Sequence, residues 1–358
     1  MEGSTLHSFF KLPFHPLVPD DPRFSPHKLR DFLKYKKSHI KLLKELDLII
    51  IDESSMLDME TAFYFLSAVR KGTHILFVGD VEQLPSVGPG AVLRDLIDCG
   101  IIPVTKLQKT FRQDNNTTFY ANIRRIQNGY AGLETGPDFK LINTTKKEVQ
   151  QKTISLALDC IRTYGLDNVV ILTPYRRKGD ACSNVFNSIM QSIVNPLGTK
   201  PYIKAEIMEP GDEISRHVTF QVGDPVMNLV NRKEVSNGEV GKISDVSERG
   251  VTVQFIDCTV FYPKRLLGQL SLAYAMSVHK SQGCEYACVI LPLLSEHLDM
   301  LDRNLYYTAV TRGKKEFISI GENSILPAFL SKESGYSRVT RLSMEIREEY
   351  FKAALLTA

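Results

Sequence analysis

The sequence carries no large excess of charge of either sign, since 44 lysine and arginine residues face 41 aspartate and glutamate residues. The formal net charge of +3 excludes a general basic field, so a nucleic-acid groove would have to be built from local clusters. The sequence also lacks an apolar run of membrane-spanning length, and its N-terminus lacks the charged-then-apolar order of a signal peptide. We therefore expect no membrane partner and a cytoplasmic location, or the host-cell cytoplasm or nucleus for a viral protein.

Cysteine is scarce and shows no metal-ligand spacing. The six cysteines are scattered along 358 residues without a CxxC pair, which predicts reduced thiols rather than a disulfide framework or a zinc site. By contrast, 43% of the residues are hydrophobic and 24% are charged, which is the balance of a globular protein with a substantial core. The length allows two domains and a small insertion.

Several short apolar runs end abruptly in polar residues, glycine or proline. Continuous apolar runs are typical of strands covered on both faces, as in parallel sheets, and helical patterns such as 59–70 and 116–127 lie between them. The combination predicts an α/β fold in which ligands gather where the strands end. The runs are Leu48–Ile51, Ile75–Val78, Val169–Leu172, Val289–Leu291 and Phe317–Ile320.

The pattern changes between about Val222 and Leu267. Short apolar runs there are separated by turn signals at Asn237-Gly238 and Arg249-Gly250, which predicts a small antiparallel β unit inserted in the second half of the chain. The main domain boundary is expected in the glycine- and proline-containing stretch from Gly129 to Asp138.

The run Leu48–Ile51 leads directly into Asp52 and Glu53, the arrangement of a Walker B strand. The aspartate of such a pair can hold Mg²⁺, and the glutamate can polarise the water that attacks a terminal phosphate. One strand later, Gly79–Gly90 falls at the same edge of the sheet, where Gln83 could sense that phosphate. Each feature has a plainer alternative, namely a solvated turn for the carboxylates and a ligand-free turn for 88–90.

Further strings follow along the chain, and together they resemble the motifs of superfamily 1 helicases of the RecD-like branch. IIIDESSM (49–56) and GDVEQLPSVGPG (79–90) resemble motifs II and III, and LQKTFRQ (107–113) resembles motif IV. The other matching strings are STLHSFF (4–10, motif Ia), LTPY (172–175, start of the second motor domain), LAYAMSVHKSQGCE (272–285, motif V) and NLYYTAVTR (304–312, motif VI). The strings at 224–228 and 235–241, which resemble the small barrel of this branch, and the tail 340–342 favour it over other superfamily 1 helicases.

The resemblance implies an α/β fold with two RecA-like parallel-sheet motor domains and an SH3-like β-barrel inserted in the second. The expected limits are 1–130 for an N-terminally truncated first motor domain, 131–223 with 268–330 for the second, 224–267 for the barrel and 331–358 for a C-terminal tail. It also implies an ATP-dependent DNA helicase or translocase that uses ATP and Mg²⁺. Such a protein moves 5′ to 3′ on single-stranded DNA or on DNA with a single-stranded 5′ end.

By resemblance, the motifs supply residues to a nucleotide site and a nucleic-acid site. Asp52 would hold the metal and Glu53 would activate water, while Arg112 and Arg312 would converge on the terminal phosphate from opposite halves of the chain. Taken alone, these arginines could be salt-bridged surface residues, and His279 could be an ordinary histidine. The catalytic set is Glu53, Asp52, Gln83, Arg112 and Arg312. The nucleotide-binding set is Asp52, Gln83, Arg112, Lys280, Gln282, Gly283 and Arg312, and the nucleic-acid-binding set is Thr5, His7, Pro174, Tyr175, Ser277 and His279.

The sequence departs from the family in one respect, because it contains no GxxxxGK[ST] loop. Its two Gly-Lys pairs, 241–242 and 313–314, are followed by isoleucine and lysine. Since this loop supplies much of the binding and charge neutralisation of a nucleotide, we expect little unwinding by the isolated chain.

Two explanations of the missing loop stay open. The chain could be a fragment or split form whose P-loop lies on another chain, or a non-catalytic DNA-binding or scaffold subunit derived from a helicase. An ATPase that acts on RNA is a further alternative, because grooves that follow the backbone distinguish the sugars poorly.

Overall fold

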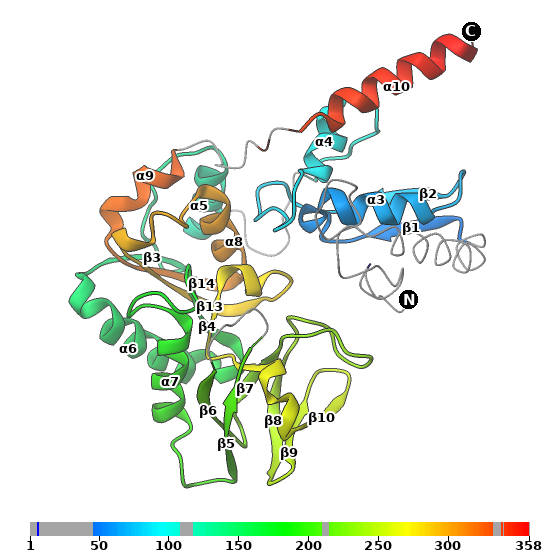
Figure 1. Ribbon diagram of the computed structural model, residues 1–358. Coiled ribbons are helices and arrows are strands. Elements are labelled where there is room, and N and C mark those ends of the chain that lie inside the picture. The colour runs from blue at the N-terminus through cyan, green and yellow to red at the C-terminus, as the bar shows by residue number, and fades with distance from the viewer. Residues whose placement is uncertain are drawn as a thin grey trace. The chain divides into compact units, whose positions relative to one another are not determined.

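The computed structural model describes residue 6 and residues 46–107, 117–209, 215–331, 338 and 340–357. The chain forms two compact units, Met1–Gln108 with Tyr336–Ala358 (unit 1) and Lys109–Gly335 (unit 2), and each has its own parallel strands (Figure 1). Thr5, His7 and Arg112 lie outside the described residues, so their expected roles stay predictions. Within the described part of the chain, no helix combines the length and the apolar character needed to cross a membrane.

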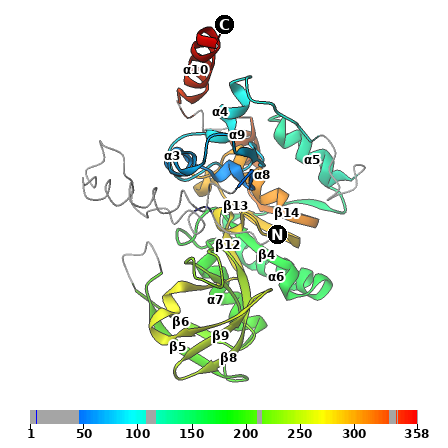
Figure 2. The same cartoon turned by 90° about the vertical axis from the view of Figure 1, so that its right-hand side faces the viewer.

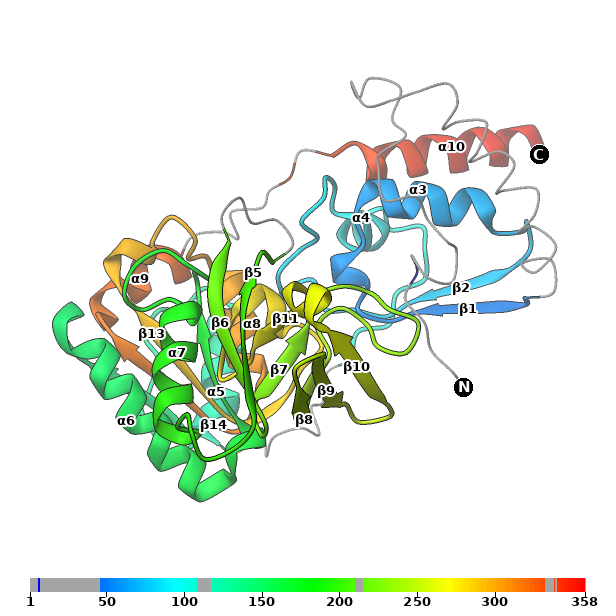
Figure 3. The same ribbon diagram turned by 60° about the horizontal axis from the view of Figure 1, so that its bottom comes forward.

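Unit 1 is built on two parallel strands joined by a helical crossover. Its elements are β1 (Leu48–Ile51), η1 (Ser54–Met56), α3 (Met59–Ala68), β2 (His74–Phe77), α4 (Val92–Asp98) and α10 (Leu342–Thr357). Asp58 caps α3 by accepting a 2.7 Å hydrogen bond from the amide of Thr61. Figure 3 shows β1 and β2 side by side with α3 along them.

The two faces of the β1–β2 pair differ in how far they are covered. Tyr64 and Phe65 of α3 pack on one face, together with Ile51 at the end of β1. The opposite face carries Leu48, Ile50 and Leu76, whose exposed fractions are 54%, 50% and 50%. Parallel strands with apolar side chains on both sides are normally covered on both faces. The second face of this pair is therefore an exposed apolar surface of a kind that is usually buried.

The C-terminal segment belongs to unit 1, although it follows unit 2 in the chain. Its helix α10 packs against α4, and Leu342 at the start of α10 joins the core formed by Leu57, Ala62 and Val92 (Figure 1). The expected C-terminal tail is therefore a structural part of unit 1.

Unit 2 contains a five-stranded parallel sheet with the order β12-β4-β13-β14-β3. The strands are β3 (Phe139–Asn143), β4 (Val169–Thr173), β12 (Ala275–Ser277), β13 (Tyr286–Leu293) and β14 (Gly313–Gly321). Helices cover both faces, with α6 and α7 on one and α5, α8 and α9 on the other (Figure 1). These helices are α5 (Thr118–Gln127), α6 (Lys146–Tyr164), α7 (Ser183–Val194), α8 (Arg303–Thr311) and α9 (Leu326–Leu330).

Antiparallel strands extend unit 2 on the side of α7 (Figure 2). One sheet has the order β10-β9-β8-β7-β11, and a separate hairpin pairs β5 with β6. The strands are β5 (Tyr202–Ile207), β6 (Arg216–Gln221), β7 (Pro225–Asn228), β8 (Val240–Ser247), β9 (Gly250–Gln254), β10 (Thr259–Pro263) and β11 (Leu270–Leu272).

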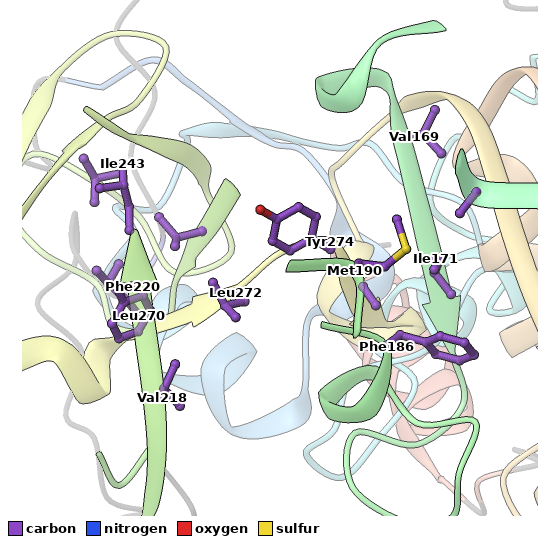
Figure 4. Packing of buried hydrophobic residues seen from close by; sticks show 14 of the residues in the cluster. Val169, Ile171, Phe186, Met190, Val218, Phe220, Ile243, Leu270, Leu272 and Tyr274 are labelled. Atoms are coloured by element: carbon purple, nitrogen blue, oxygen red, sulfur yellow. The ribbon is translucent and has the colours of Figure 1, made fainter. Parts of the chain in front are cut away.

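One hydrophobic core joins the parallel sheet of unit 2 to its antiparallel strands. Figure 4 shows Tyr274 between Ile171 and Phe186 on one side and Phe220 and Ile243 on the other. The hydroxyl of Tyr274 donates a 2.8 Å hydrogen bond to Asp224, which is fully buried and also accepts from Asn195 and Gln191. The continuous core makes unit 2 a single packed body.

The α/β class predicted from the sequence is confirmed, because each of the five continuous apolar runs forms a parallel strand. The antiparallel region and its turns at Gly238 and Gly250 are also found, and Gly238 adopts a φ of 93°. The hairpin β5–β6 was not expected. The stretch 129–138 falls within unit 2, because Phe119 of α5 already packs against Phe139 and Phe317 of the parallel sheet.

Candidate functional site

The turn at Asp52 and Glu53 lies where β1 ends, and its backbone has an unusual conformation. Glu53 has φ 52° and ψ 39°, and it is the one residue other than glycine with a positive φ in the described ranges. The Glu53 amide donates a 2.8 Å hydrogen bond to the Asp52 carboxylate, and the Ser54 amide donates to Val78, also at 2.8 Å. The left-handed conformation costs energy for a residue with a Cβ, so the surrounding contacts hold it in place.

The loop after β2 packs directly against this turn. A Cβ at Gly79 would lie 2.9 Å from the amide nitrogen of Ser55, so only glycine allows the approach. The loop then turns at Asp80, whose carboxylate accepts from the Glu82 amide at 3.0 Å and whose carbonyl accepts from the Gln83 amide at 3.2 Å. The structure therefore brings the Asp52–Glu53 turn and the Gln83 loop together at one edge of the sheet, while the chemical roles of these residues remain predictions.

The expected nucleic-acid residues of unit 2 follow two neighbouring strands. Pro174 and Tyr175 come after β4, and Ser277 ends β12, which runs parallel to β4 with Ser277 opposite Thr173. The Thr173 hydroxyl donates a 2.8 Å hydrogen bond to the carbonyl of Tyr175, which fixes the turn out of β4. The strand ends place both groups at the same edge of the parallel sheet.

Beside these residues lies a cationic cluster that sequence reasoning did not identify. Glu209 is buried, and its carboxylate accepts hydrogen bonds from Arg176, at 2.6 Å, and from Arg216. Burial lowers the pKa of Lys280. The negative charge of Glu209 acts in the opposite direction, and the positive charges of the nearby arginines lower this pKa further. Burial, and then the charge of Arg176, lowers the pKa of Arg177. Arg176 and Arg216 thus pair with one buried carboxylate, whose charge also acts on Arg177 and Lys280. A small pocket is lined in part by Arg176, Ser277 and Lys280.

The 3-10 turn after β12 carries three further expected residues. His279 is mostly buried, which lowers the pKa of its imidazole, and the carboxylate of Asp302 partly offsets this effect. Asp302 caps α8 through a 2.7 Å hydrogen bond from the Leu305 amide, and burial raises the pKa of Asp302. Gln282 is half-buried, whereas Gly283 is exposed with φ 77°. The segment is therefore partly buried at His279 and exposed at Gly283.

Arg312 lies at the C-terminal end of α8 and is only 3% exposed. Its guanidinium donates to the carbonyl of Thr308 at 3.2 Å, to the carbonyl of Cys284 at 3.3 Å and to the hydroxyl of Thr311 at 3.3 Å. These oxygens all belong to unit 2 and include no carboxylate.

The sequence matches two family models. Residues 2–144 match an AAA domain, and residues 272–318 match the UvrD-like helicase C-terminal domain. The ATP-dependent RecD2 DNA helicase of Deinococcus radiodurans is 32% identical over 278 residues, which cover 78% of this chain and 37% of the relative. The RecBCD enzyme subunit RecD of Mycolicibacterium smegmatis is 27% identical over 310 residues, covering 84% of this chain and 54% of the relative. This chain thus spans about half or less of the length of these relatives.

The fold is similar to that of solved helicase structures. A crystal structure of Pif1 helicase from Bacteroides in complex with ADP-AlF3 and ssDNA superimposes with a TM-score of 0.54 at 20% identity, covering 98% of this chain and 84% of that one. Parallel sheets with Asp52–Glu53 in one unit and the Ser277–Gln282 turn in the other, together with both family matches, define a superfamily 1 helicase. Within that superfamily, the chain belongs to the RecD-like branch.

Proposed function

We propose that this chain is the core of an ATP-driven motor that moves 5′ to 3′ on single-stranded DNA. The observation that carries the proposal is the contact between the Asp52–Glu53 turn and the Gly79 loop, since it brings two carboxylates and Gln83 to one strand edge. Asp52 is exposed where it could hold Mg²⁺, and Glu53 beside it could orient the attacking water. ATP would bind at this strand edge, where Gln83 would contact its terminal phosphate. Lys280, Gln282 and the two arginines of motifs IV and VI stay nucleotide-binding candidates by resemblance.

The cationic cluster of unit 2 supports a nucleic-acid site in the same motor. Nucleic-acid backbones are bound largely through cations, and Arg177 follows the expected contact residue Tyr175 closely in the chain and is exposed. Single-stranded DNA, or DNA with a single-stranded 5′ end, is the ligand we propose for this edge of the sheet.

The finer architecture is also a proposal. We infer that the parallel sheets of both units are RecA-like, and that the five antiparallel strands between β7 and β11 form the SH3-like barrel of this branch. The limits 1–130, 131–223 with 268–330, 224–267 and 331–358 stay predictions.

The exposed face of β1 and β2 supports a separate P-loop segment. Leu48, Ile50 and Leu76 form an apolar surface on the side of the sheet opposite α3. We propose that in the complete motor a further segment supplies a strand that joins the sheet, a GxxxxGK[ST] loop and a helix that covers this face.

Phosphate release from ATP tests the proposal. The purified chain is assayed with and without single-stranded DNA, alone and together with a polypeptide that carries the strand, P-loop and helix, with Glu53→Gln as the control. We expect DNA-stimulated release in the supplemented mixture and its loss in Glu53→Gln. A supplemented chain that binds DNA and releases no phosphate would overturn the motor and favour the alternative, a non-catalytic DNA-binding or scaffold subunit.

A further inference from the structure

The C-terminal segment reaches the loop that follows Gln83. Arg338 lies just before α10, and its guanidinium is surrounded by oxygens of residues 86–90. One terminal nitrogen donates to the Ser86 hydroxyl at 3.1 Å, to the Gly90 carbonyl at 2.7 Å and to the Gly88 carbonyl, and the other donates to the Ser86 carbonyl. The Arg338 side chain therefore donates hydrogen bonds to three backbone carbonyls of one short loop.

These contacts suit arginine and no other cation. The guanidinium is planar and always charged, and its donors point in fixed directions, so it can hold several carbonyls in one geometry. Hydrogen bonds from a charged donor are stronger than neutral ones. A lysine ammonium at Arg338 would keep the charge but lose the fork that reaches both sides of the loop.

The opposite side of the 86–90 loop rests on α3. The Met59 amide donates a 2.9 Å hydrogen bond to the Pro89 carbonyl, and a Cβ at Gly88 would overlap the side chain of Asp58, the cap of α3. The loop is therefore held between the start of α3 and Arg338. Since α3 follows the Asp52–Glu53 turn by only a few residues, the loop and the turn share one support.

The remainder of the C-terminal segment is anchored independently of Arg338. Leu342 packs in the core of unit 1, the Thr340 hydroxyl donates a 3.0 Å hydrogen bond to Asp95, and Arg347 donates to the carbonyl of Cys99 at 2.7 Å. Loss of Arg338 alone would leave these anchors in place, so its effect should be confined to the loop.

We propose that Arg338 is a positioning residue for the motor, which fixes the loop after Gln83 and so sets where Gln83 stands beside Glu53. The proposal rests on the function proposed above for Gln83. Arg338 touches neither nucleotide nor nucleic acid in this role, and it acts only through the loop. The C-terminal segment thereby supports the loop that belongs to the proposed nucleotide site of unit 1.

Amide hydrogen exchange of the full chain tests this directly and requires no nucleotide. The variants are Arg338→Ala, Arg338→Lys and the control Arg341→Ala, whose side chain is 73% exposed and pairs only with Glu345 in the described contacts. We expect exchange of the Met59 amide, which donates to the Pro89 carbonyl, to rise by about tenfold or more in Arg338→Ala, by less in Arg338→Lys, and not at all in the control. Exchange in the remainder of α3 and in β1, and the thermal midpoint, should stay near those of the parent.

Unchanged exchange of the Met59 amide in Arg338→Ala, or an equal rise throughout unit 1, would overturn the proposal. In the mixture that releases phosphate, we further expect the kcat of Arg338→Ala to fall more than its KM for ATP rises, with partial rescue in Arg338→Lys. An equal kcat in Arg338→Ala and the parent would count against a role in turnover. If the parent itself releases no phosphate, the motor function fails, and the exchange result still decides whether Arg338 fixes the loop.

Discussion

Gly79 lies against the backbone of Ser55, and this contact joins the two loops of unit 1 that carry the candidate catalytic residues. A Cβ at Gly79 would come within 2.9 Å of the Ser55 nitrogen and 2.8 Å of a methyl carbon of Leu93. The Ser55 nitrogen belongs to the backbone, so it cannot move away by a change of rotamer. The distance between the Asp52–Glu53 turn and the Gln83 loop therefore depends on the absence of a side chain at one position.

Gly79→Ala should push the two loops apart. Overpacking of this kind costs about 1–3 kcal/mol, so we expect the free energy of unfolding to fall by that amount in urea titrations. Phosphate release in the supplemented mixture should fall as well. Gly132→Ala is the matched control, because Gly132 is exposed and has open space around its Cα. Similar losses in both variants would contradict the close approach as the cause.

Glu53 combines a left-handed backbone with a carboxylate, and substitution can separate the two. Glu53→Gly relieves the backbone, whereas Glu53→Ala keeps the strain and removes the carboxylate. We expect Glu53→Gly to be more stable to urea than Glu53→Ala by up to about 1 kcal/mol, because the left-handed cost exceeds the entropy that glycine adds to the unfolded chain. Both variants should lose phosphate release. If alanine proves the more stable, the conformation at Glu53 is not strained.

The sheet of unit 2 could be predicted from the sequence where its strands are continuous and apolar. Val169–Thr173 is buried at every residue, and its continuous apolar sequence predicted this strand. The hairpin strand Tyr202–Ile207 alternates exposed and buried residues, and this period of two was the signal that could have revealed it. β12 spans only Ala275–Ser277, which is too short to carry any period.

The candidate site was predictable only where strand order alone brings residues together. Asp52 and Gln83 follow neighbouring parallel strands, so their proximity follows from the fold class. Glu209 meets Arg176 across 33 positions, and Arg338 meets Ser86 across 252, so no local pattern links either pair. Such contacts depend on how separate segments pack, which a single sequence does not encode locally.

Arg177 should contribute to DNA affinity through charge. It is exposed beside Arg176 and the pocket at Ser277, and we expect Arg177→Ala to weaken binding of single-stranded DNA. The plot of log affinity against log salt should lose about 0.7 of its slope, the value for one phosphate contact on a single strand. The exposed Lys147→Ala on α6 serves as the control and should leave the slope unchanged. An unaltered slope in Arg177→Ala would place the strand elsewhere.

His297 should make the stability of unit 2 sensitive to acid. The imidazole is fully buried after β13, its ring packs edge-on against Tyr175, and its Nδ1 accepts a 3.2 Å hydrogen bond from the Leu294 amide. Burial lowers the pKa of His297 from an ordinary value of 6.5 to about 4. Between these two pKa values, His297 is protonated in the unfolded chain and stays neutral in the folded chain. Stability is therefore complete above the unfolded pKa and falls as the pH drops towards 4.

The expected loss from His297 between about pH 7 and about pH 5 is about 2 kcal/mol in the free energy of unfolding, measured by urea titration at each pH. His297→Asn should remove most of this pH dependence, because the amide oxygen can still accept from Leu294 but does not titrate. His217→Asn is the control, since His217 is exposed and should leave the slope as in the parent. A parent protein equally stable at both pH values would mean that the His297 ring can take up a proton in the folded state, and that its pocket is wetter than its burial indicates.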